Sequence, residues 1–313
     1  MNTVFPQRQR GVALVSVLLI LALVTAGVAH LVLADNLSLR RLSNQREAEQ
    51  AWQLALGAEQ WASKVLERDA KGTQTDHLNE PWNALLPPIT VEDGSMTARL
   101  EDAQGRLNVN NLATGRSGSW YPVFVRLLQA LEIDAGVADA VVDWLDADLD
   151  VNGLHGAEDP QYQLRKPPYR AANRAIVDTG ELLWVAGMDA PALARLAPYL
   201  TAVPAQNLRV NVNTCLPLLL RALADPALSE GDALALAAAR GVTGYKDTQS
   251  FLAQAPLAGK GDRLEPLIGV QSAWFELRAD ATVGRVRHHL QSLLHRRGTG
   301  QAIIVQQRRR PLV

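Results

Sequence analysis

The first long apolar stretch of the chain covers residues 11–34, where no side chain carries a fixed charge and Val, Leu, Ile and Ala dominate. At about 1.5 Å of rise per helical residue, this stretch would extend roughly 36 Å, enough to cross a hydrocarbon core of about 30 Å. Arg8 and Arg10 precede it without any acidic residue, whereas both charge signs follow it. The pattern predicts one membrane-spanning helix with the short leader in the cytoplasm.

The helical pattern continues beyond this segment. Residues 35–69 contain no proline. Apolar side chains recur there at roughly the spacing of one helix face, at Leu39, Leu42, Ala51, Leu54, Ala58 and Trp61. A secretory signal peptide would have a shorter apolar core, of about 7–15 residues, and a small-x-small cleavage site after it. The sequence instead predicts a continuous stem helix of about 55 residues, embedded in the membrane first and amphipathic afterwards.

Strand-like alternation lies near the two ends of the remaining chain. Residues 89–101 predict a hairpin with its turn at Asp93-Gly94. Residues 273–281 and 301–308 also alternate like strands, while 283–295 fits either a strand or a helix. The segment between them is rich in Ala and Leu and predicts helices. The simplest architecture is α+β: a long stem helix on a small antiparallel sheet, with a large all-α domain inserted between the strands.

The tripeptide Asn-Val-Asn occurs at 108–110 and again at 211–213, each time before an apolar helical run. Asn side chains favour helix starts, so we predict two helical lobes that begin alike.

Composition excludes several classes of protein. The 31 basic and 32 acidic side chains give a net charge of −1, which argues against a general nucleic-acid binder. The single cysteine, Cys215, excludes an internal disulfide framework and a cysteine-based zinc site. A mean hydropathy of −0.04 excludes a polytopic membrane protein, although an average can conceal one membrane segment.

The strongest signal of chemistry is an acidic loop, because residues 132–159 include many carboxylates and no Lys or Arg. Numbered from Asp148, the loop has Asp at positions 1 and 3, Asn at 5, Gly153 at 6 and Asp at 12. This is the calcium-loop template, with Asp in place of the usual final Glu. We predict a structural calcium site formed by residues from this set: Asp143, Asp146, Asp148, Asp150, Asn152, Glu158 and Asp159.

Two alternatives remain for this loop. It could be a solvated acidic loop, or a carboxylate pair in it could be catalytic, which would make the protein a membrane-anchored, calcium-dependent periplasmic hydrolase. Pro160 opposes the exit helix of a full EF-hand. No Ser, Cys or Lys nucleophile is obvious nearby, so we expect no enzymatic activity.

Residues 9–15, Gln-Arg-Gly-Val-Ala-Leu-Val, resemble the prepilin-peptidase site of type IV pilins and type II secretion pseudopilins. The resemblance implies cleavage between Gly11 and Val12 on the cytoplasmic side. Most members have a glutamate at the fifth mature position, where this chain has Ser16. In this respect the chain resembles minor pseudopilins of the K type, which also lack this glutamate. A subunit at a filament tip has no subunit ahead to pair with that carboxylate, and an unpaired charge in a bilayer costs several kcal/mol.

Motifs along the rest of the chain resemble those of the type II secretion system protein K family. They lie at 101–110, 143–148, 156–162, 169–173, 181–188 and 211–214. The resemblance implies a pseudopilin fold with a calcium-binding inserted domain. The implied divisions are a leader (1–11), the membrane part of the stem (12–34), the periplasmic stem and first strands (35–111), the inserted helical domain (112–270) and the closing strands (271–313).

By this resemblance, the chain is expected to be a minor pseudopilin that caps the tip of the type II secretion pseudopilus. It would initiate pseudopilus assembly and support protein export across the outer membrane. The implied partners are the minor pseudopilins of the I and J types, the pseudopilus and the prepilin peptidase, with no nucleic acid. The implied location is the inner membrane, crossed once, with a cytoplasmic N-terminus and a periplasmic body.

A DNA-binding alternative comes from residues 181–196, which resemble a helix-hairpin-helix. Such a hairpin holds DNA phosphates through free N–H groups at a helix start. Asp189 and Pro191 occupy positions where a DNA-binding hairpin favours Gly and Lys, so we expect a structural hairpin.

N-terminal sequencing of the protein extracted from membranes should find Val12 as the first residue. A mature chain that begins at any other position would contradict the predicted processing site.

Overall fold

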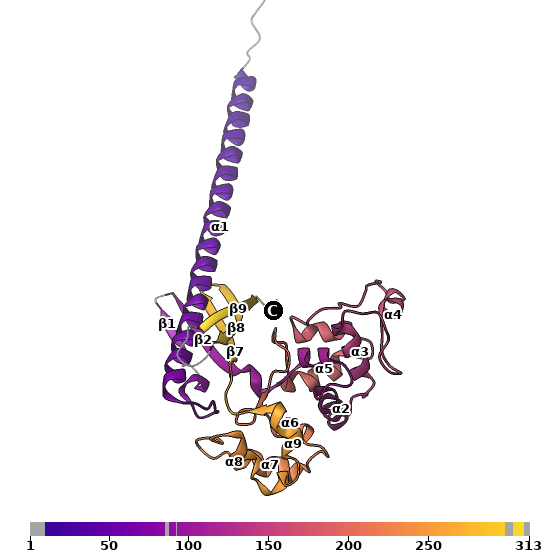
Figure 1. The fold of residues 1–313 in the computed structure, drawn as a ribbon. Helices are drawn as coiled ribbons and strands as arrows, with labels where there is room; N and C mark the ends of the chain where they lie inside the picture. The colour runs from indigo at the N-terminus through magenta and orange to yellow at the C-terminus, as the bar shows by residue number, and fades with distance from the viewer. Residues whose placement is uncertain (1–9, 85–87, 92, 298–302, 310–313) are drawn as a thin grey trace, which may run out of the picture.

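The computed structural model describes residues 10–84, 88–91, 93–297 and 303–309. Residues 1–9, most of the predicted leader, lie outside the described residues, whereas Gly11 and Val12 belong to the first turns of the long helix α1 (Arg10–Gly72). In Figure 1, α1 rises from a sheet, and two groups of short helices lie beside and below that sheet.

The helix α1, called the stem here, is unbroken over 63 residues, so it is longer than the predicted helix. Its N-terminal part contains a window with a mean hydropathy of 2.8, none of which is buried. The stem is therefore long and apolar enough to cross a membrane, as the sequence predicts. The Ser16 hydroxyl donates to the Val12 carbonyl oxygen at 2.9 Å, which satisfies this polar group within the helix.

A small antiparallel sheet packs against the lower part of the stem. Within the described residues its strand order is β1-β2-β7-β8-β9. The strands are β1 (Ile89–Val91), β2 (Gly94–Asp102), β7 (Trp274–Val283), β8 (Val286–Arg296) and β9 (Ile303–Arg309). The predicted hairpin is β1 and β2, and the ambiguous segment 283–295 is mostly strand β8. The α+β class is confirmed, with a stem helix on a small sheet and a large helical insertion.

The stem contacts the sheet through a stripe of small side chains. Ala51, Ala55, Ala58, Ala62 and Leu66 are fully buried, and their spacing of three or four residues places them on one face of the helix. Larger apolar side chains from β2, β7 and β8 complete this core. Because alanine side chains are short, the helix axis can lie close to the sheet.

Apart from the stem and one 3-10 turn that follows it, the helices of the described residues lie between β2 and β7, and we call them together the helical body. Its first lobe (residues 103–201) contains η2 (Ala103–Gly105), β3 (Leu107–Asn108), η3 (Val109–Thr114), α2 (Trp120–Ala130), α3 (Val137–Leu145), α4 (Asp159–Gln163), η4 (Thr179–Trp184), α5 (Ala190–Leu196), η5 (Ala197–Tyr199) and β4 (Leu200–Thr201). Its second lobe (residues 210–269) contains β5 (Val210–Asn211), α6 (Pro217–Leu223), α7 (Glu230–Ala238), α8 (Thr248–Leu252), η6 (Ala255–Leu257), α9 (Gly261–Leu264), η7 (Glu265–Leu267) and β6 (Ile268–Gly269). A further 3-10 turn, η1 (Pro81–Asn83), follows the stem.

The two lobes follow the same plan. In each, a short strand pairs in parallel with the strand that closes the lobe, β3 with β4 and β5 with β6. The second Asn of each Asn-Val-Asn does not cap a helix. Instead, the Asn110 amide bonds both the N–H and the carbonyl of Ile176, and the Asn213 amide bonds those of Tyr245 in the same way. The prediction that the lobes begin alike is therefore confirmed, but these two side chains clamp a distant loop.

A buried ion pair connects the stem with the C-terminal strand. Glu59 is only 4% exposed, and its carboxylate accepts two hydrogen bonds from the Arg308 guanidinium, at 2.8 and 2.7 Å. The Ser292 hydroxyl on β8 donates a third at 2.8 Å. Arg308 thus belongs to strand β9 and holds it to the stem.

Replacing Arg308 by alanine should lower the free energy of unfolding by about 1–2 kcal/mol. The substitution would leave the buried Glu59 carboxylate without its cation, but the exposed half of the Arg308 side chain reduces the effect. Chemical denaturation of the purified chain measures this loss. Lys64→Ala, at an exposed pair with Glu67, is the control and should change stability by less than about 0.5 kcal/mol. A similar loss in both variants would contradict a special role for Arg308.

Candidate metal centre

Helix α3 holds one end of the acidic loop, and all of its side chains are buried. Asp139 and Asp143 lie one turn apart on it, so they point the same way. Asp139 is well satisfied, because it accepts a hydrogen bond from the Tyr121 hydroxyl at 2.5 Å and pairs with Arg116 at 3.2 Å. The Oδ1 atom of Asp143 accepts from the Asn152 N–H at 3.0 Å, while its Oδ2 atom has no partner.

Several buried oxygen atoms in and beyond the acidic loop lack hydrogen-bond partners among the described residues. They are Asp143 Oδ2, Asp146 Oδ1, Glu158 Oε1, Glu158 Oε2 and Asn173 Oδ1. Proteins rarely bury acceptors without a donor, and uncompensated buried carboxylates are especially costly. Oxygen atoms of this kind fit a hard cation such as Ca²⁺.

The loop backbone and amide side chains arrange these oxygens. The Asn152 side chain donates to Asp146 Oδ2 at 3.1 Å, and the Asn173 side chain donates to the Asp148 carbonyl at 3.3 Å. A Cβ atom on Gly156 would lie 2.3 Å from Asp143 Oδ2, so only glycine allows this close approach. Gly153 has a φ of 65°, the left-handed conformation expected of the turn glycine.

Burial and mutual repulsion raise the pKa values of these carboxyl groups. Desolvation, followed by the charges of Asp143, Asp146 and Asp148, raises the pKa of Glu158 to about 7. Desolvation and the charges of Asp148 and Asp143 raise the pKa of Asp146 to about 6. Burial also raises the pKa of Asp143. Without a cation, the group therefore favours protonated carboxyls, and a bound cation would offset the repulsion.

The structure separates the predicted metal residues into different environments. Asp143, Asp146 and Glu158 each have unpartnered buried oxygens, and Asn152 donates hydrogen bonds to Asp143 and Asp146. The side chains of Asp148 and Asp150 are exposed. The carboxylate of Asp159 accepts from the Ala171 N–H at 3.1 Å and lies 3.6 Å from Arg170.

Asn173 was absent from the predicted set. The motif at 169–173 contained it, but an uncharged amide far along the chain gives no signal of a metal ligand by itself. Only the folded structure shows that its Oδ1 atom is buried without a hydrogen-bond partner.

A second acidic cluster lies at the lower end of the stem. Asp69, Asp76 and Glu80 place carboxylate oxygens within 4.8 Å of one another. Arg296 lies against them, 3.0 Å from Asp69 Oδ2 and 2.5 Å from Asp76 Oδ2. Because an arginine already occupies this cluster, it is an ion-pair network and a poorer match to a cation than the acidic loop.

The alternative functions find little support in the geometry. In the hairpin at 181–196, the carboxylate of Asp189 accepts from the Ala192 N–H at 2.7 Å, so an acidic side chain already caps the start of α5 where DNA phosphate would bind. Cys215 is buried, and desolvation raises the pKa of its thiol to about 11, which disfavours the nucleophilic thiolate.

Comparison with known proteins identifies the family. Two family profiles, both described as type II secretion system (T2SS) protein K, match residues 105–205 and 210–271. The type II secretion system protein K of Pseudomonas aeruginosa is 36% identical over 307 residues, covering 94% of this chain and 90% of that protein. This chain belongs to the type II secretion system protein K family. The protein K of Aeromonas hydrophila is also 36% identical, over 310 residues, covering 93% of this chain and 94% of that protein.

A solved structure supports the same assignment. A chain in the crystal structure of the GspK-GspI-GspJ complex from the type 2 secretion system of enterotoxigenic Escherichia coli has a TM-score of 0.80 and 29% identity. The match covers 87% of this chain and all (100%) of that chain. The predicted family is therefore confirmed, and this chain is a minor pseudopilin of type II secretion. The two profiles also coincide with the two lobes of the helical body.

Proposed function

We propose that this chain caps the tip of the type II secretion pseudopilus, initiates its assembly and supports export across the outer membrane. The observation that carries the proposal is the position of the helical body, which lies beside the stem at its sheet end (Figure 1). Pseudopilin stems associate side by side, so a body of this size would collide with neighbouring subunits if it recurred along a tightly packed filament. One copy at the end avoids these collisions, and the role needs no catalysis.

The stem supplies the proposed contacts with partners. Leu37, Leu39 and Leu42 lie beyond the apolar segment and are 45–64% exposed. A neighbouring stem would cover them. The relative in the solved complex is found with GspI and GspJ, so minor pseudopilins of the I and J types are the proposed partners.

We further propose that the prepilin peptidase removes residues 1–11 and that residues 12–34 anchor the chain in the inner membrane. The exposed apolar side chains of this part of α1 support the anchor, and the arginines of the leader support a cytoplasmic N-terminus. The sheet and helical body would then lie in the periplasm.

Calcium is the proposed structural cofactor of the first lobe. Asp143, Asp146, Glu158 and Asn173 would hold it, because their buried oxygens lack other partners. A bound divalent cation would compensate the clustered negative charge. These residues would then keep the long loop between α3 and α4 in one conformation.

Calcium should raise the melting temperature of the protein, and the rise should shrink as the pH falls. Raised pKa values mean that the metal-free chain loses stability as the pH rises from about 4 to about 7, because the folded state then gives up protons it prefers to keep. Calcium binds the deprotonated groups, so its effect should be full near pH 8 and lost as the pH falls through the pKa of Glu158, about 7, and that of Asp146, about 6. Thermal melts with calcium and with chelator measure it.

Glu158→Gln should abolish most of the calcium effect. Asp150→Asn changes an exposed carboxylate of the same loop and should keep most of it. An equal loss of the calcium effect in both variants would favour the calcium-loop template numbered from Asp148 over the buried, unpartnered oxygens. The absence of any calcium effect in the unaltered chain would refute calcium as the cofactor.

If the protein caps the tip, an antibody against it should label pseudopili only at their ends. Strands β2 and β7 are neighbours, with Asp102 opposite Phe275, so residues 105–271 can be replaced by a short turn. Immunogold labelling of assembled pseudopili should find the full chain only at ends. The shortened chain that also carries Ser16→Glu should appear along the shaft as well, because the colliding body is gone and the usual carboxylate is restored. Full-length protein distributed along the shaft would refute the capping role.

A further inference from the structure

The helical body meets the stem and sheet at a narrow region, which we call the joint. The buried apolar side chains form one cluster in the helical body, another between stem and sheet, and a small third cluster around Ala103, Val203 and Trp274. A cleft of about 710 Å³ opens on one side of this small cluster, lined by Ala70, Gln104 and Arg296 among others. Little apolar contact therefore holds the two parts together.

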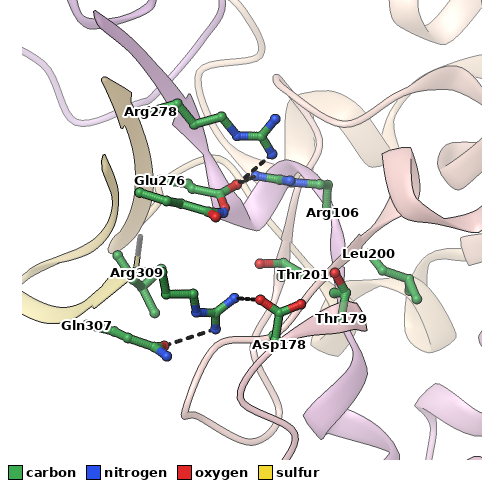
Figure 2. A pocket seen from close by; sticks show the side chains of 12 residues that line it. Arg106, Asp178, Thr179, Leu200, Thr201, Glu276, Arg278, Gln307 and Arg309 are labelled. Atoms are coloured by element: carbon green, nitrogen blue, oxygen red, sulfur yellow. Dashed lines mark hydrogen bonds and ion pairs between the residues drawn. The ribbon is translucent and has the colours of Figure 1, made fainter. Parts of the chain in front are cut away.

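A second, polar cleft of about 190 Å³ separates the first lobe from the outer face of the sheet. Figure 2 shows that Arg309 of β9 reaches across it to Asp178 at the start of η4, while Arg106 and Arg278 converge on Glu276. The Arg309–Asp178 pair is partly exposed and therefore weak, whereas the Arg106 and Glu276 side chains are mostly buried and form a firmer contact. The joint depends on its buried polar network.

That network contains four carboxyl groups and one arginine. Asp69 belongs to the stem, Asp76 and Glu80 follow the stem, and Asp102 ends β2, whereas Arg296 ends β8. All four acidic residues are at least half buried, and Asp76 and Asp102 are 1% and 7% exposed. Carboxyl groups thus outnumber the cation inside the joint.

The contacts of Arg296 and Asp76 tie the two parts of the molecule together. Arg296 bonds Asp69 at 3.0 Å, Asp76 at 2.5 Å and the Ser272 carbonyl at 2.6 Å. Asp76 also accepts from the Ser272 N–H at 2.7 Å. Ser272 lies in the link from the second lobe to β7, so this network fixes where the helical body rejoins the sheet.

Asp102 links the same network to the second lobe. Its Oδ2 atom accepts from the Thr214 hydroxyl at 2.5 Å, the Ser272 hydroxyl at 2.7 Å and the Asn211 amide at 3.1 Å. The Asn211 amide also donates to the Asp76 carbonyl at 3.0 Å. Both carboxylate oxygens of Asp76, Glu80 and Asp102 thus have hydrogen-bond partners.

Other charged groups near the joint do not balance the carboxyl excess. The His77 ring lies 3.8 Å from Glu80, whose oxygens also accept from Thr73 and Trp82. Arg209 and Asp247 line the large cleft and carry opposite charges. Burial is the main cause that raises the pKa of Asp69 to about 7 and that of Asp102 to about 6, and it also raises the pKa of Asp76.

We propose that the joint is a proton-linked hinge, which holds the helical body in one orientation when its carboxyl groups share protons and loosens when they are all ionised. Because the pKa values are raised in the folded joint, its stability falls as the pH rises. The stabilising protons are bound at low pH and lost as the pH rises through about 6 to 7. The ionised joint buries several negative charges against one guanidinium, and repulsion then favours opening at the clefts.

The test measures the distance between stem and second lobe in the full chain, reconstituted in a bilayer nanodisc. Spin labels are placed at Gln60→Cys on the stem and at Leu234→Cys on α7, both exposed, while the native Cys215 is buried. The distance distribution should be narrow at about pH 5 and should lose its narrow peak at about pH 8. An equally narrow distribution at both pH values would overturn the proposal.

Asp69→Asn keeps an acceptor for Arg296 but removes one titrating charge. The variant should keep the narrow distribution at both pH values. Asp280→Asn, at an exposed carboxyl on β7, is the matched control and should broaden with pH like the unaltered chain. If Asp69→Asn does not fold, Glu80→Gln provides the comparison, because it removes a negative charge that acts on Asp69. Broadening that persists unchanged in both joint variants would assign the movement to other groups and refute the hinge.

Discussion

The pairing of β2 with β7 is the constraint on which the rest of the molecule depends. The chain leaves the sheet after Asp102 and returns opposite it at Phe275, so the whole helical body enters and leaves through adjacent points. The stem and the sheet can therefore form a complete core without the helical body. The body, in turn, has its own core and reaches the sheet through one small contact region. Both the steric argument for a tip position and the clefts at the joint follow from this arrangement.

Hydrogen bonds from asparagine amides hold each lobe of the helical body closed, which longer paired strands do in other proteins. Each lobe has strands of only two residues, too short to hold a lobe closed. Asn110 and Asn213 instead bond both backbone groups of one distant residue, which fixes the return of the chain. Two residues after each clamped position, Asp178 and Asp247 begin the next helical turn with a capping box. The same local chemistry thus builds both lobes.

Periodicity explains what could be predicted from the sequence. The stem and the first hairpin carry strong helical and alternating patterns, and both were predicted in type. Strand β8 was ambiguous because polar residues such as His288 and His289 occupy its middle, and they obscure the alternation that Leu290 and Leu294 carry toward the stem. Acidic residues adjacent in sequence indicated a metal site, but burial selects among them: it favours Asp143 and Glu158 over Asp150. The joint escaped prediction because its charged residues come from three distant parts of the chain: residues 69–80, Asp102 and Arg296.

The two lobes share one plan but differ in the length of one connection. In the first lobe, residues 146–178 connect α3 to η4 and carry the unpartnered oxygens. In the second lobe, only residues 239–247 connect the corresponding α7 to α8. The scaffold therefore closes with or without a long connection at this position. The long acidic loop is therefore an addition to a unit whose clamp and closing strands are also present where the connection is short.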